Sequence, residues 1–133
     1  MTALLDTNVI VRFLTGNADE RFKGVFKFFQ DIEIGVITVE LKLIVLFQTI
    51  FVLKSYYEVP KHRITVAVNG ILRLKGLRLV DKKIIQKTLE IWENENVEIV
   101  DAYLIACVEK DPQNIIYSYD RYFDKFNIKR IEP

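Results

Sequence analysis

The sequence predicts an α/β fold, a three-layer α/β/α domain around a short, mostly parallel sheet. Short apolar runs alternate with longer segments of helical periodicity along the whole chain. Half of the 133 residues are hydrophobic and 28% are charged, which is typical of a globular protein and excludes a disordered chain. No repeat, low-complexity tract or linker rich in Pro, Gly or Ser divides the chain, so residues 1–133 are expected to form a single domain.

The first third of the chain is expected to begin with a short buried strand over residues 3–5. A helix over residues 9–14 should follow and end before Gly16-Asn17, and Asp19 can cap the next helix. That second helix would place bulky apolar side chains on one face, namely Phe22, Val25, Phe26 and Phe29.

A second strand is expected over residues 35–38, before a long helix over residues 40–57. This helix is apolar nearly all round, which is typical of a buried helix. Pro60 fits the first turn of a further helix. The inward side chains of that helix would be Ile64, Val68, Ile71 and Leu72.

The rest of the chain is expected to hold short strands over residues 77–80, 115–119 and 128–131, with helices over residues 82–95 and 102–110. Asp81 and Asp101 stand where these two helices would begin. The first of the helices places Ile85, Leu89 and Trp92 on one face. Strands that are separated by helices imply parallel pairing, with helices on both faces of the sheet.

Two aspartates directly follow predicted strands, Asp6 after the first strand and Asp120 after residues 115–119. In a parallel sheet both lie at the carboxyl edge, where such folds bind ligands. Asp101 could cap its helix or point into the same crevice. Three carboxylates in one place repel each other, and a bound Mg²⁺ or Mn²⁺ removes that cost. The alternative for each aspartate is a helix cap or a turn.

Three segments, in this order, resemble motifs of the PIN-domain family, specifically the VapC-type toxins of toxin–antitoxin modules. They are Leu4-Leu5-Asp6-Thr7-Asn8-Val9-Ile10, Asp101-Ala102-Tyr103-Leu104-Ile105-Ala106 and Tyr117-Ser118-Tyr119-Asp120-Arg121-Tyr122-Phe123. The length and the helical segments between the motifs also agree, so the resemblance covers nearly the whole chain. It implies a PIN-like fold, an endoribonuclease that cuts RNA with Mg²⁺ or Mn²⁺, a cognate antitoxin and a homodimer.

The resemblance also implies roles for the matching positions. Asp6, Asp101 and Asp120 would coordinate the metal ions. Asn8 and Ser118 match polar positions that orient the site in the family. The alternatives are helix capping for Asn8 and an ordinary strand hydroxyl for Ser118.

The second motif departs from the family, because Gln48 stands where a glutamate is expected, in Gln48-Thr49-Ile50-Phe51-Val52-Leu53. Glutamine keeps the shape of glutamate and loses its charge, so the nuclease is expected to be weakened or inactive. The substitution fits a natural, altered nuclease or an engineered change that silences a toxic enzyme. Alternatively, Glu40 supplies the acid from two turns earlier in the same predicted helix, about 12 Å along its axis.

Several other residues are candidates for supporting roles. Asp124 lies one helical turn after Asp120 and could be an accessory acid, with a surface position as the alternative. Lys54 and Arg121 are candidate phosphate contacts. An aromatic cluster could meet a partner or pack on the sheet; it consists of Phe22, Phe26, Phe28 and Phe29.

Other function classes find less support. The net charge of +1 gives no overall basic field, and the lone Cys107 excludes an intrachain disulfide and is expected to be an inert core residue. The single histidine, His62, lies between Lys61 and Arg63 and indicates a surface position. No phosphate-binding glycine loop, signal peptide or membrane span is evident, so a cytoplasmic protein is expected. The rival functions are a PIN-like module that binds RNA or protein without cutting, and a phosphoryl-transfer domain with Asp6 as phospho-acceptor.

Overall fold

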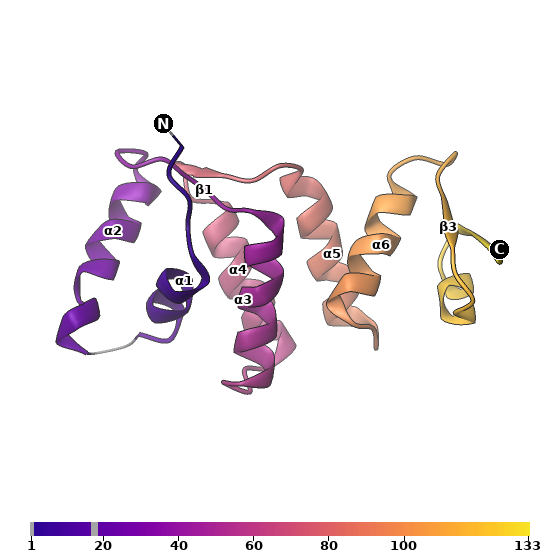
Figure 1. Ribbon diagram of the computed structural model, residues 1–133, viewed down its shortest axis with the longest axis horizontal. Coiled ribbons are helices and arrows are strands. Elements are labelled where there is room, and N and C mark those ends of the chain that lie inside the picture. Colours follow the sequence, from indigo (N-terminus) through magenta and orange to yellow (C-terminus); the bar gives the residue numbers. More distant parts are fainter. Residues whose placement is uncertain (1, 17–18) are drawn as a thin grey trace. The chain divides into compact units, whose positions relative to one another are not determined.

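The computed structural model describes residues 2–16 and 19–133, so Asn17 of the predicted Gly16-Asn17 helix stop lies outside the described residues (Figure 1). The chain folds as two compact units, an N-terminal unit of Met1–Val80 and a C-terminal unit of Asp81–Pro133. Within the described residues the strands form two separate parallel pairs instead of the one sheet expected. The α/β class with short parallel strands is nevertheless confirmed.

The N-terminal unit contains, in chain order, α1 (Thr7–Leu14), η1 (Glu20–Phe22), α2 (Gly24–Glu33), β1 (Val39–Glu40), α3 (Leu43–Ser55), α4 (Lys61–Leu72) and β2 (Leu77–Arg78). β1 pairs with β2 in parallel. The strand expected at residues 3–5 is reduced to one parallel bridge between Leu4 and Glu40. Helix α1 packs against α2 and α3, and α3 packs against α4.

Two predicted boundaries in this unit are wrong. Residues 35–38 are not a strand, because Gly35 takes a φ of +83° and turns the chain directly after α2. Helix α3 begins at Leu43, because the backbone of Glu40 is engaged in strand pairing: its N–H donates to the Ala3 carbonyl and its carbonyl accepts from the Leu5 N–H. Asp19 accepts from the Arg21 N–H and so caps η1, a short 3₁₀ turn, and not α2 itself.

The C-terminal unit contains α5 (Lys82–Asn94), α6 (Ile99–Glu109), β3 (Ile115–Tyr117), η2 (Arg121–Lys125) and β4 (Lys129–Ile131). β3 and β4 pair in parallel, and α5 packs against α6. Helix α6 begins at Ile99, which places Asp101 inside its first turn and not before it as predicted. Asp81 does occupy the cap position of α5, but its side chain makes no capping bond and lies 3.7 Å from the Lys110 ammonium.

Each unit has its own buried apolar face. The helix periodicity predicted these faces correctly, since Ile64, Val68, Ile71 and Leu72 of α4 and Ile85, Leu89 and Trp92 of α5 are all buried. Burying one such aliphatic side chain fully is worth roughly 1.5–3 kcal/mol, which explains why the apolar stripes decide how the helices pack. Cys107 is only half-buried in α6, so its expected place in the core is wrong.

The aromatic cluster of η1 and α2 has both buried and exposed side chains. Phe29 is buried and stacks on Phe13 with ring centroids 4.1 Å apart, whereas Phe26 is 40% exposed. The Phe22 ring lies under the guanidinium groups of Arg12 and Arg21. Among the described helices, none combines the length and the apolar character needed to cross a membrane.

Candidate active site

Asp6 occupies the cap position of α1 without capping it. Its backbone is extended, with φ −99° and ψ 153°, and its side chain makes no hydrogen bond to the N–H groups of the first turn. The residue is exposed, and its carboxylate is therefore not committed to the helix end, which was the alternative explanation for an acid at this position.

Gln48 lies exposed near the middle of α3, and its amide oxygen accepts a hydrogen bond from the Thr7 hydroxyl over 2.8 Å. Thr7 itself is 8% exposed in the first turn of α1. A core glutamine satisfied by backbone groups is therefore not what the structure contains. The hydrogen bond instead ties the glutamine to the residue that follows Asp6.

Asp6, Asn8 and Gln48 line one pocket of about 430 Å³ in the N-terminal unit. Helix α1 contributes Asn8, Val11 and Arg12, and α3 contributes Gln48 and Val52 with Tyr56 at its end. Asn8 and Arg12 are four residues apart, as are Gln48, Val52 and Tyr56, so each helix lines the pocket with one face.

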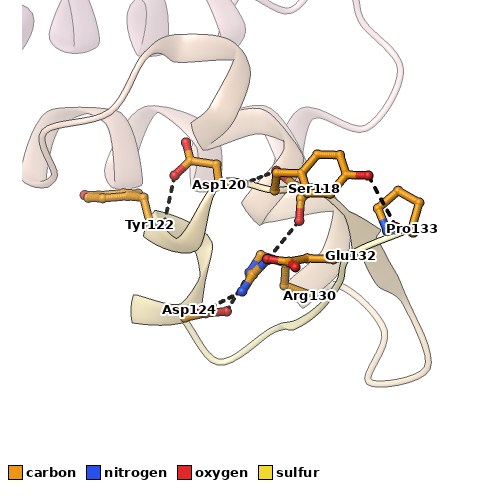
Figure 2. A network of polar contacts seen from close by, with 8 residues as sticks. Ser118, Asp120, Tyr122, Asp124, Arg130, Glu132 and Pro133 are labelled. Carbon is orange, nitrogen blue, oxygen red and sulfur yellow. Dashed lines mark hydrogen bonds and ion pairs between the residues drawn. The ribbon is translucent and has the colours of Figure 1, made fainter.

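Asp101 and Asp120 belong to the C-terminal unit. Asp120 follows β3 and caps η2, accepting from the Tyr122 N–H over 2.9 Å, while its own N–H donates to the Ser118 hydroxyl oxygen over 3.0 Å (Figure 2). Burial raises the pKa of Asp101, and the negative charges of Asp120 and Glu98 raise it further. The two aspartates predicted as ligands thus interact electrostatically within this unit.

Comparison with known protein families matches residues 3–129 to the PIN domain. The chain belongs to the PIN domain family. PIN domains are generally nucleases that act on RNA with divalent metal ions such as Mg²⁺ or Mn²⁺. The comparison with curated proteins found no match.

The donor groups of this PIN domain suit a hard divalent cation. Mg²⁺ keeps several waters and is often held by one or two carboxylates, together with phosphate oxygens of the substrate. In the C-terminal unit, Asp101 and Asp120 supply two carboxylates whose mutual repulsion a cation would relieve. In the N-terminal unit, Asp6 supplies a carboxylate that does not cap α1. In neither unit does the described part of the chain gather three or more acidic, histidine or cysteine side chains that could hold a metal ion.

Asp124 is engaged elsewhere in the PIN domain. Both of its carboxylate oxygens accept hydrogen bonds from Arg130, at 2.9 and 3.1 Å, and these bonds lower the pKa of Asp124 (Figure 2). The Arg130 guanidinium also donates to the Ser118 carbonyl and the Glu132 carboxylate, both at 2.9 Å. Arg130 therefore fastens the turn that carries Ser118 and Asp120 to strand β4.

Other predicted residues have different outcomes. Glu40 lies in strand β1 and its carboxylate is 2.6 Å from the Lys42 ammonium, so a role for it on an earlier turn of the Gln48 helix is wrong. Lys54 is exposed on α3 and is not among the residues that line the Gln48 pocket. Arg121 is exposed at the start of η2, next to Asp120.

The sequence-based reasoning did not identify Arg12, Tyr56 and Tyr57 as site residues, although all three line the pocket with Asp6 and Gln48. The signal that could have found two of them is helical spacing. Arg12 is one turn after Asn8, and Tyr56 is two turns after Gln48, so each shares a helix face with a residue of a family motif.

Proposed function

We propose that this PIN domain is a divalent-metal-dependent endoribonuclease, the toxin component of a type II toxin–antitoxin system, and that Gln48 weakens its activity. The observation that carries the proposal is the pocket of the N-terminal unit. It is lined by Asp6 and Asn8 from the first family motif and by Gln48 from the second, although the two motifs lie far apart in the sequence. The family match runs through both units, which supports treating the chain as one domain.

In this proposal Asp6, Asp101 and Asp120 hold Mg²⁺ or Mn²⁺, and Asn8 and Ser118 orient the site. When bound, the ions would activate a water molecule and stabilise the charge that grows on the phosphodiester. Ser118 fixes the turn before Asp120 by accepting from its backbone N–H, which holds the Asp120 backbone in place. A nearby cation would favour the charged form of Asp101, because burial and the negative charges of Asp120 and Glu98 raise its pKa in the cation's absence.

Gln48 weakens the proposed nuclease by charge and not by shape. Its amide oxygen takes the place of one carboxylate oxygen of glutamate and accepts from Thr7 as a carboxylate would. It brings no negative charge, so it attracts a cation far less strongly. Both origins of the glutamine, a natural change and an engineered one, are compatible with this proposal.

The test compares this chain with its Gln48→Glu variant on a mixed RNA pool, with Mg²⁺, with Mn²⁺ and with EDTA. We expect the variant to cut only with metal and this chain to be at least about tenfold slower, as for a lost group that stabilises transition-state charge. Asp6→Asn introduced into the Gln48→Glu chain should abolish cleavage. Glu40→Gln in the same background is the matched control and should not affect cleavage, because Glu40 pairs with Lys42.

The second candidate is a PIN domain that binds RNA or protein without cutting, and the glutamine at the second motif is the observation that favours it. If the folded Gln48→Glu variant is as inert as this chain on every RNA tested, the binding module replaces the nuclease.

A cognate antitoxin, a homodimer and a cytoplasmic location complete the proposal. The apolar pocket of about 380 Å³ lined by Phe22, Val25 and Phe28 supports a protein partner, since exposed apolar surface often marks an interface. Light scattering of the purified chain tests the dimer, and a monomer at all concentrations would contradict it.

A further inference from the structure

Two tyrosines line the pocket that holds Asp6 and Gln48. Tyr56 is 78% exposed and Tyr57 39% exposed, and their rings meet edge to face with centroids 4.9 Å apart. Exposed rings offer flat faces on which another ring can stack, and here they border a polar pocket and not an apolar one. An aromatic ring beside amides and a guanidinium is a combination that suits a nucleotide.

Arg12 supplies a positive charge to the same pocket, and its guanidinium contacts an aromatic ring. Its guanidinium carbon lies 4.2 Å from the centroid of the Phe22 ring, within the range of a cation–π contact. A guanidinium that is already oriented loses less freedom when it forms paired hydrogen bonds to a phosphate. Arg12 therefore offers an oriented anion contact within the pocket of the tyrosines.

We propose that Tyr56, Tyr57, Arg12 and Asn8 form a binding subsite for one nucleotide of single-stranded RNA. The base stacks on the exposed Tyr56 ring, which packs edge to face with Tyr57. Arg12 binds the adjoining phosphate, and the exposed Asn8 amide faces the base or ribose as donor and acceptor. Single-stranded RNA is recognised in this way, by stacking of unpaired bases on aromatic rings and by arginine contacts to the backbone.

This inference rests on the proposed nuclease function, because the subsite adjoins Asp6 and Gln48 within one pocket. The nucleotide bound there would lie next to the phosphodiester that is cut. RNA is favoured over a peptide, because the pocket combines a base-sized aromatic platform with a cation and lies beside two positions of the family motifs.

The test measures binding of fluorescently labelled single-stranded oligoribonucleotides in EDTA by anisotropy, where metal-dependent cleavage cannot occur. Tyr56→Leu should weaken binding about 5- to 150-fold, the range seen when one base loses its stacking partner. Tyr56→Phe should bind like the unchanged chain, because the ring is kept. Arg12→Ala should weaken binding and flatten its dependence on salt.

Phe51→Leu is the matched control, since Phe51 is 67% exposed on α3, directly before the tyrosines, and is not among the residues that line the pocket. Equal binding by Tyr56→Leu and the unchanged chain, an equal loss with Phe51→Leu, or no RNA binding at all would overturn the subsite. Capture of an aromatic peptide by this pocket without RNA binding would also overturn it.

Failure of the subsite and failure of the nuclease give different results. If RNA binding depends on Tyr56 and yet Gln48→Glu never cuts, the subsite stands and the catalytic proposal fails. If Gln48→Glu cuts with metal and Tyr56→Leu changes neither binding nor cleavage in that background, the nuclease stands and the subsite fails.

Discussion

The hydroxyl of Thr7 donates to the amide oxygen of Gln48 over 2.8 Å, and so joins the first turn of α1 to the middle of α3. Thr7 directly follows Asp6, so this bond fixes the position of Gln48 relative to the residue proposed to bind metal. An amide and a carboxylate can both accept it. The bond therefore explains how a charge can be lost at this position while the local structure is kept.

A double-mutant cycle of Thr7→Val and Gln48→Leu should measure this bond. We expect a coupling energy of about 1 kcal/mol in the free energy of unfolding from urea denaturation, the usual net value of one hydrogen bond. Thr15→Val is a control for loss of a threonine hydroxyl, because the Thr15 hydroxyl, directly after α1, donates to the Val11 carbonyl of that helix and not to α3. Additive effects of Thr7→Val and Gln48→Leu would contradict a bond that contributes to stability.

The Asp101→Asn variant should be more stable than the unchanged chain at pH 7 in EDTA. The pKa of Asp101 is raised in the folded state by burial, then by Asp120 and Glu98. Below the unfolded-state pKa of about 3.9, Asp101 is protonated in both states and does not oppose folding. As the pH rises through the folded-state pKa, the carboxyl loses its proton and the folded state loses stability. The melting temperatures of the two proteins should converge below about pH 4.

Mn²⁺ should then raise the melting temperature of the unchanged chain more than that of Asp101→Asn. If Asp101→Asn is instead less stable than the unchanged chain in EDTA at pH 7, the prediction fails. The favourable interaction of a negative charge with the first turn of α6 would then outweigh its burial.

Asp124→Asn should lower the melting temperature above about pH 4 and have little effect at lower pH. The Arg130 guanidinium lowers the pKa of Asp124, so the stabilisation is present above the unfolded pKa and is lost as the pH falls through the folded one. Added salt should reduce the difference because the carboxylate is exposed. Thermal melts across pH and salt give the measurement, and a difference that is constant down to pH 2 would refute it.

Gly76→Ala should destabilise the N-terminal unit by at least about 3 kcal/mol. A Cβ at this position would lie 2.0 Å from the Ile37 carbonyl oxygen and 2.9 Å from that of Ile32, so the backbone would have to move. Gly70→Ala is the matched control, since nothing lies within 4 Å of its Cβ in α4. That variant should gain about 0.5–1 kcal/mol from helix propensity. Similar effects of the two substitutions on urea unfolding would contradict this account.

The helices and their buried faces could be predicted from the sequence, because burial repeats with the helical period. Ile64, Val68 and Leu72 recur every four residues and are all buried on α4. The strands were harder to predict from the sequence, because each is only two or three residues long and is defined by the strand it pairs with. Residues 39–40 form a strand since Leu77 and Arg78 lie beside them, which no local pattern around residue 39 reports.

Residues of the candidate site could be predicted only where they belong to the family motifs, which occur in a fixed order along the chain. Asp6 and Gln48 were predicted this way, and both line one pocket in the structure. Arg12 and Tyr56 were missed because an exposed polar or aromatic residue on a helix looks like ordinary surface. Only the packing of α1 against α3 makes them neighbours of the motif residues. The start of the helix that carries Asp101 was predicted three residues too late, at Ala102 instead of Ile99, because the apolar Ile99 and Val100 give no sign of a helix start.

The two parallel strand pairs differ in the length of the segment that connects their two strands. Ile115 pairs with Lys129 across a short segment, whereas Val39 pairs with Leu77 across one more than twice as long, which includes α3 and α4. Each doubling of a loop adds only about 0.6 kcal/mol of closure entropy, so this difference matters little for stability. It matters more for the order of events, because contacts between distant residues form late. The β3–β4 pair beside Asp120 should thus assemble early in folding, and the β1–β2 pair should be among the last contacts made.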